Sequence, residues 1–148
     1  MTVALVLVGP IILLILYVIM TYNGLISDKN HVEEGWSGID VQLKKRHNLI
    51  PALVETVKGV TKHEDSVFTK IAEYRAKSLG AGPSQEKQKM ETAITSSLKS
   101  IFALAESYPE LKSNTNFQEL QEQLGVIEDD ISMSRRYYNG TVLSLIHI

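Results

Sequence analysis

The feature that most constrains this chain is a long apolar run near its first residue. From Val3 to Met20 the only interruptions are a Gly-Pro pair and one tyrosine, and a proline is tolerated inside a membrane helix. Eighteen helical residues rise about 27 Å, close to the thickness of the hydrocarbon core of a bilayer. All 15 Lys and Arg residues and all 17 Asp and Glu residues follow Tyr22. The run therefore predicts a transmembrane anchor over residues 1–22, which contacts the lipid bilayer through residues 3–20.

Two alternatives to an anchor fit the run less well. A cleaved signal peptide has basic residues before its apolar stretch and a small-residue cleavage site, but Met1-Thr2 is uncharged and Met20-Thr21-Tyr22-Asn23 offers no such site. A buried helix of a soluble protein would need a large protein around it. Lys29 and the cluster Lys44-Lys45-Arg46 follow the run and no basic residue precedes it, so the positive-inside rule favours a single-pass protein of the cell membrane with its domain in the cytoplasm.

Composition narrows the function classes for the rest of the chain. The 148 residues leave room for one domain after the anchor, which we place at residues 23–142. A formal net charge of −2 gives no basic footprint for nucleic acid. The lack of cysteine excludes disulfides, thiolate metal ligands and cysteine nucleophiles.

Apolar residues after the anchor recur every three or four positions, a heptad-like pattern typical of helices that bury one face, as in coiled coils. The stripe runs through Val32, Trp36, Ile39, Leu43, Ile50, Leu53 or Val54, Val57, Val60, Val67 or Phe68, and Ile71. It predicts a long first helix from Leu25 towards Ser78. Pro51 has no N–H group and its ring crowds the preceding turn, so we expect a kink or a break near Leu49-Ile50.

Two further helices are expected. One covers Gln85 to Tyr108, with Ser84 as its cap and Pro109 ending it, and its inner face carries Met90, Ile94, Leu98, Ile101 or Phe102, and Ala105. The other begins at Thr115, which has capping-box spacing to Gln118, and its stripe is Phe117, Leu120, Leu124, Ile127, Ile131, Ser134 and Tyr138. No segment requires a strand, and the short connections favour antiparallel neighbours. The expected fold class is all-α: a single transmembrane helix followed by an antiparallel up-and-down helical bundle with a long, Pro-kinked first helix.

The sequence gives no support for catalysis. The histidines are His31, His47, His63 and His147, and neither His47 nor His63 has the Glu three residues earlier that a di-iron bundle requires. The pair His63-Glu64 lacks the second histidine of a zinc-protease helix. There is no strand before the Gly80–Gly82 loop, as a phosphate-binding loop would need. We therefore expect no enzymatic activity, no cofactor and no bound metal.

Charge is distributed unevenly over the predicted bundle. Seven acidic residues and one lysine lie between Glu106 and Asp130, whereas Lys44-Lys45-Arg46 and Arg135-Arg136 are basic clusters. The simplest interpretation is that these are solvated helix faces whose opposite charges attract within the molecule. A second interpretation is a docking face for a basic partner, with charge setting partner choice and encounter rate. A third interpretation, contact of Lys44-Lys45-Arg46 with anionic lipid, has less support, because this cluster would lie roughly 36 Å along a helix from the bilayer.

Several strings of residues resemble the LemA family, in the order that the family has them. They are Tyr22-Asn23-Gly24-Leu25, Val32-Glu33-Glu34-Gly35-Trp36-Ser37, the stretch from Asn48 to Gly59, His63-Glu64, the stretch from Ala105 to Lys112, Asn116-Phe117-Gln118-Glu119-Leu120-Gln121, and Arg135-Arg136-Tyr137-Tyr138-Asn139. The resemblance implies a bacterial protein with one N-terminal membrane helix and a helical-bundle domain. It brings no established activity, cofactor or catalytic residue, and an accessory role beside membrane proteases or other envelope proteins is consistent with it.

Ten residues match motif positions of that family, and we take them as candidate interaction or structural positions: Trp36, Asn48, Pro51, Tyr108, Pro109, Asn116, Phe117, Arg135, Tyr138 and Asn139. Core packing is the expected role of the three aromatic residues on the heptad stripe. Asn48 and Asn139 are expected near helical seams, where they would tie helices together by hydrogen bonds. After Asn139 the chain departs from the family pattern, so residues 143–148 are treated as an atypical tail, as from a frameshift or a translated adaptor, and His147 is given no functional weight.

The sequence therefore predicts a membrane-anchored helical interaction or scaffold protein of the bacterial cell envelope. Its partner would be an unidentified membrane or cytosolic protein, and self-association stays open. The alternatives are an accessory subunit of a membrane enzyme such as a protease, with His63 and Glu64 as the residues to test, and a self-assembling protein that shapes membranes.

Overall fold

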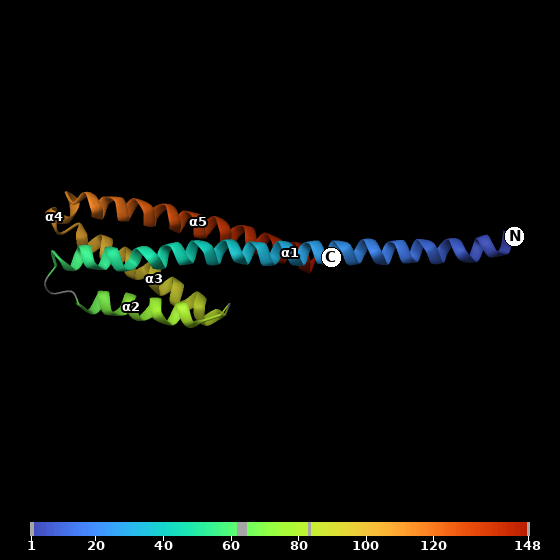
Figure 1. Ribbon diagram of the computed structural model, residues 1–148, viewed down its shortest axis with the longest axis horizontal. Helices are drawn as coiled ribbons and strands as arrows, with labels where there is room; N and C mark the ends of the chain where they lie inside the picture. Colours follow the sequence, from blue (N-terminus) through green and yellow to red (C-terminus); the bar gives the residue numbers. More distant parts are fainter. Residues whose placement is uncertain (1, 62–64, 83, 148) are drawn as a thin grey trace. The chain divides into compact units, whose positions relative to one another are not determined.

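The computed structural model describes residues 2–61, 65–82 and 84–147, and within them the chain is helical, with no strand (Figure 1). The helices are α1 (Thr2–Lys58), α2 (Asp65–Gly80), α3 (Gln85–Ala105), α4 (Pro109–Lys112) and α5 (Thr115–Ile146). The all-α prediction is confirmed. The chain divides into two compact units, a bundle unit of residues 42–129 and a terminal unit of residues 1–41 and 130–148.

The bundle unit is built from the end of α1, from α2, α3 and α4, and from the beginning of α5. Short connections turn the chain back on itself, and Figure 1 shows α2 and α3 side by side. Each helix buries the residues of its heptad stripe in one shared core, which holds Ile50, Leu53 and Val57 of α1, Phe68 and Ile71 of α2, Ile94, Leu98, Ile101 and Ala105 of α3, Leu111 of α4, and Phe117 and Leu124 of α5. The periodicity of the sequence is therefore the physical cause of the bundle.

Of the two alternatives expected near Leu49-Ile50, a kink or a break, the break does not occur: α1 runs through Pro51 to Lys58. A proline at this position has no N–H to donate to the carbonyl of His47, four residues earlier. The Arg75 side chain of α2 replaces that donor, with its Nε 2.7 Å from the His47 carbonyl oxygen. The first two helices separate instead beyond Lys58, where the Thr61 N–H closes the last turn on the carbonyl of Val57 at 3.0 Å.

The ends of the helices follow the sequence with two corrections. Ser84 caps α3 as expected, because its Oγ accepts a hydrogen bond from the Lys87 N–H at 3.2 Å. The capping box of Thr115 and Gln118 is wrong, since Asn114 caps α5 by accepting from the Phe117 N–H at 3.1 Å. The helix α3 ends at Ala105 rather than Tyr108, and Pro109 begins α4, where a proline has no donor to lose.

The terminal unit contains the apolar segment. Every residue from Ile11 to Met20 is between 49% and 74% exposed. By length and composition, α1 is the one helix among the described residues that could cross a membrane. Apolar side chains exposed around a whole helix are not stable in water, which is consistent with membrane anchoring through this segment.

The terminal unit also contains an antiparallel contact between α1 and α5. Gly35 and Ile39 of α1 and Ile131 of α5 are buried. The rings of Trp36 and Tyr138 meet edge to face, with centroids 5.7 Å apart and an angle of 66° between their planes. Gly35 permits a close approach here, because a Cβ at this position would lie 3.2 Å from the Cα of Tyr138, which is tighter than most Cβ contacts.

Candidate functional site

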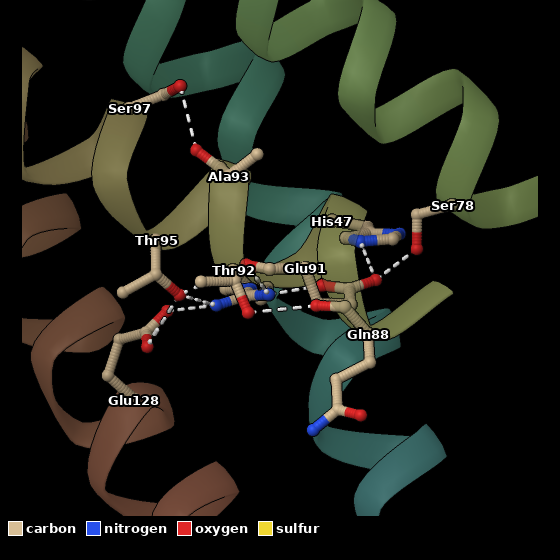
Figure 2. A network of polar contacts seen from close by, with 10 residues as sticks. His47, Ser78, Gln88, Glu91, Thr92, Ala93, Thr95, Ser97 and Glu128 are labelled. Atoms are coloured by element: carbon tan, nitrogen blue, oxygen red, sulfur yellow. Dashed lines mark hydrogen bonds and ion pairs between the residues drawn. The ribbon is translucent and has the colours of Figure 1, made fainter. Parts of the chain in front are cut away.

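The bundle unit encloses a network of charged side chains centred on Arg46 of α1 (Figure 2). The Arg46 side chain is 0% exposed. Its Nη1 donates to the Thr95 hydroxyl at 2.8 Å and to a carboxylate oxygen of Glu128, and its Nη2 donates to a carboxylate oxygen of Glu91 and to the Glu91 carbonyl at 3.2 Å. One guanidinium group therefore joins α1 to both α3 and α5.

Glu91 is the second centre of the network and is 1% exposed. Its Oε2 accepts from Arg46, and its Oε1 accepts from the Ser78 hydroxyl of α2 and lies 2.9 Å from Nε2 of His47. Burial by itself raises the pKa of the Glu91 carboxyl, but the hydrogen bonds from His47 and Ser78 and the charge of Arg46 together lower this pKa from 4.5 to about 2.

The helical periodicity explains why these polar groups meet. Arg46 follows Leu43 by three residues and precedes Ile50 by four, so it occupies an inner position of the stripe on α1. Glu91 stands three residues before Ile94, and Ser78 stands seven after Ile71. Charged residues at heptad positions are thus the sequence signal that would have found this site.

Three expectations are corrected by the network, among them that a lone histidine on a long helix is solvated or caps a helix end. Arg46 was grouped with Lys44 and Lys45 as a surface cluster, but only the two lysines are exposed. Glu91 rather than Met90 begins the inner face of α3, because the stripe continues back from Ile94 by three residues and not by four. His47 is buried among charges instead of solvated, being 2% exposed.

The chemistry that this arrangement supports is structural. The buried carboxylate of Glu91 accepts hydrogen bonds from Arg46 and Ser78 and lies beside His47, and Arg46 is shared between two carboxylates, so both groups are engaged within the bundle unit. Glu128 connects the network to solvent, since its side chain is 31% exposed. The described residues contain no group of three or more His, Cys, Asp or Glu side chains that could hold a metal ion. The helices α1, α2, α3 and α5 each supply a member of one hydrogen-bonded set, which favours a single register of these four helices.

The ten candidate motif residues do not form one site. Trp36 and Tyr138 meet in the terminal unit, while Phe117 is buried in the bundle unit, its ring 6.2 Å from that of Phe102. The others are spread over separate elements: Tyr108 is half-buried at the start of α4, Arg135 is half-buried on α5, and Asn48, Pro51, Pro109, Asn116 and Asn139 are exposed. His63 and Glu64 lie outside the described residues.

The fold and the network together define the class of protein: a helical bundle organised around buried ion pairs, in a chain whose first helix is long and apolar enough to cross a membrane. The sequence matches the LemA family over residues 35–145, and the chain belongs to that family. A curated relative, Protein LemA of Metamycoplasma hominis, is 24% identical over 118 residues, which are 79% of this chain and 54% of the relative. The chain thus spans about half the length of that relative.

Proposed function

We propose that this protein is a membrane-anchored interaction module, in which the apolar segment of α1 holds the chain in a bilayer and the bundle unit binds another protein without catalysing a reaction. The observation that carries the proposal is the exposure of every side chain from Ile11 to Met20 in the same helix that supplies Arg46 and Leu53 to the bundle core. An anchor continuous with a folded unit is suited to tethering.

The mechanism would be an increase in effective concentration. A single span confines the bundle unit to a layer next to the membrane, so encounters with other membrane proteins become nearly intramolecular. The ion pairs of Arg46 support this role because they hold the helices in one arrangement, and a rigid surface loses less conformational freedom on binding. The bacterial cell envelope is the setting that the family resemblance implies.

We further propose that the bundle unit faces the cytoplasm, following the distribution of basic residues around the apolar segment. The test is a pair of reporters fused after Val142, one active only in the cytoplasm and one active only outside it. Cytoplasmic activity is the expected result. Activity of the outer reporter alone would reverse the orientation and direct the search to partners outside the cytoplasm.

The test of the interaction role is cross-linking in intact membranes, with the full chain compared with a chain lacking residues 3–20 at equal expression. We expect one partner that is captured by the anchored chain and lost without the anchor. Turnover of a substrate by the purified full chain, abolished by His63→Ala or Glu64→Gln, would overturn the proposal in favour of an enzyme subunit. Concentration-dependent assembly on vesicles without any other protein would overturn it in favour of a membrane-shaping polymer.

A further inference from the structure

A cleft of about 230 Å³ opens between α3 and α5 of the bundle unit, beside the Arg46 network. Leu98 and Leu124 form its apolar floor and are 2% and 0% exposed, and the half-buried ring of Phe102 adds to that floor. Small-molecule sites commonly enclose about 300–1,000 Å³. The cleft is smaller than that, and its size suits one or two apolar side chains of a partner better than a whole ligand.

Gly125 of α5 keeps this cleft open. It lies on the cleft wall, and a Cβ built on it would meet nothing within 4 Å. Glycine is disfavoured inside helices, and here no close approach of another backbone requires it. A side chain larger than hydrogen at this position would extend into open space at the wall of the cleft.

The surroundings of the cleft are acidic. Glu128 and Asp129 lie on its rim with one lysine, Lys99. Glu122 lies seven residues before Asp129, on the same side of α5, and is exposed. Glu106 lies seven residues after Lys99, at the end of α3, and is also exposed. Glu128 is already paired with Arg46, which leaves the carboxylates of Glu106, Glu122 and Asp129 against the ammonium group of Lys99. This excess of negative charge attracts a positively charged partner and repels an acidic one.

We propose that this cleft is the docking groove for an amphipathic basic helix of a partner protein. The partner's apolar residues would contact the half-buried ring of Phe102, above the buried Leu98 and Leu124, and its Lys or Arg residues would face Glu122 and Asp129, as when a helix lies in a groove between two others. This inference rests on the proposed interaction role and names the surface that performs it.

The experiment uses the full chain in nanodiscs of uncharged lipid and a labelled 14-residue helical peptide of Leu and Lys, with a peptide of Leu and Glu as its acidic counterpart. Fluorescence anisotropy measures binding, and empty nanodiscs give the background. We expect the Leu/Lys peptide to bind more weakly as salt is raised, and the Leu/Glu peptide not to bind. Gly125→Leu should weaken binding of the Leu/Lys peptide at least tenfold, and Asp129→Asn about threefold.

Gly38→Leu is the matched control, because Gly38 is also a helical glycine with nothing within 4 Å of an added Cβ and it lies in the terminal unit. It should bind the peptide as the unchanged chain does. Equal binding by Gly125→Leu and Gly38→Leu would place the peptide elsewhere and overturn the groove, while a partner captured in the cross-linking test would still uphold the interaction role. No binding of the Leu/Lys peptide to the unchanged chain would also overturn the groove.

Discussion

Arg46 is the side chain whose position depends most on its neighbours. Moving a guanidinium group out of water is unfavourable by several kcal/mol. Negatively charged partners with good hydrogen-bond geometry are needed to offset this penalty. Glu91 and Glu128 supply two carboxylates, and Thr95 supplies a hydroxyl oxygen. Arg46 with all of its partners contributes little net stability relative to an apolar core. A buried charge that lacks one of its partners is destabilising.

The first prediction concerns removal of that charge. Arg46→Met keeps an unbranched apolar stem but leaves two carboxylates without their cation, so we expect the free energy of unfolding to fall by about 3–5 kcal/mol. Glu91→Gln should also lower the free energy of unfolding. In the Arg46→Met background this effect should be smaller by at least about 1 kcal/mol than in the unchanged chain, because the two residues interact. Urea unfolding of the four chains in a neutral detergent measures this, and strict additivity would show that the ion pair is not coupled.

The second prediction follows from the pKa of Glu91, which is about 2 in the folded chain and ordinarily 4.5. Because the folded chain holds this proton less tightly, the group stabilises the fold above pH 4.5 and its contribution is lost as the pH falls towards 2. By pH 3 the loss should be on the order of 2 kcal/mol. Glu91→Gln cannot show this loss, so the stability difference between the two chains should shrink on acidification. A constant difference between pH 6 and pH 3 would contradict the prediction.

The polar network is the part of the bundle unit that the sequence does not predict. The apolar stripe predicted the buried positions of α1 and α3 from Leu43, Ile50 and Ile94, and the structure confirms them. Charged residues usually lie on the surface, so the burial of Arg46 and Glu91 is not predicted from their residue type, although both stand at stripe positions. Their partners cannot be inferred from spacing, because the residues that meet are 45 positions apart, and only the packing of α1 against α3 joins them.

At the scale of elements, the continuity of α1 depends on a contact between helices. The carbonyl of His47 loses its donor at Pro51 and regains one from Arg75 of α2. The third prediction is that Arg75→Ala lowers the free energy of unfolding by about 1–3 kcal/mol, the effect of leaving a partly buried acceptor unpaired. In a Pro51→Ala background the backbone N–H returns, and the effect of Arg75→Ala should be at most half as large. Equal effects in both backgrounds, measured by urea unfolding, would show that Arg75 acts in another way.

The pairing of α1 with α5 depends on Gly35. A Cβ there would lie 3.2 Å from Cα of Tyr138 and 3.3 Å from a ring carbon of Tyr137, closer than ordinary contact. The fourth prediction is that Gly35→Val separates the two helices in the terminal unit, which changes the environment of Trp36, the one tryptophan of the chain. Its emission should shift to longer wavelength, as expected when Trp36 loses Tyr138 and meets water.

Gly38→Ala is the comparison for that experiment, since an added Cβ there meets nothing within 4 Å. It should leave the Trp36 emission unchanged and stabilise the helix by up to about 1 kcal/mol through helix propensity. An unchanged emission spectrum in Gly35→Val would show that the close approach of Gly35 to Tyr138 does not hold the pair together.

The elements themselves were more predictable than their ends. The helices, the Ser84 cap and the antiparallel order follow from periodicity and short loops. The sequence left a kink and a break at Pro51 as alternatives because proline weakens a helix locally, whereas the Arg75 hydrogen bond that compensates for it is a tertiary contact. Asn114 was overlooked as a cap because Thr115 and Gln118 also fit a capping pattern, and local sequence does not decide between adjacent candidates.

At the scale of the whole molecule, the chain has exposed apolar residues of two kinds. Leu14 of the apolar segment is 62% exposed, and Val126 of the bundle unit is 56% exposed. A substitution at either position removes little packing within the protein. The two residues differ in their neighbours. Leu14 is surrounded along α1 by other exposed apolar residues, whereas Val126 is separated from the next large exposed apolar residue of α5, Met133, by seven positions, and an isolated apolar residue is ordinary for a protein surface.

The fifth prediction uses this pair of residues to test the anchor. An arginine at the centre of a membrane helix is unfavourable by about 2.5–3.5 kcal/mol, so two of them in Leu13→Arg/Leu14→Arg should prevent stable insertion. We expect this double variant to leave the membrane fraction on carbonate extraction, while Val126→Arg stays in it as the unchanged chain does. Both variants add positive charge at exposed positions. A difference in their retention in the membrane fraction therefore reports insertion into the bilayer and not a change in folding. If the double variant stayed with the membrane at pH 11, the segment from Ile11 to Met20 would not be what holds the protein there, and the bundle unit itself would have to bind the lipid or a resident membrane protein.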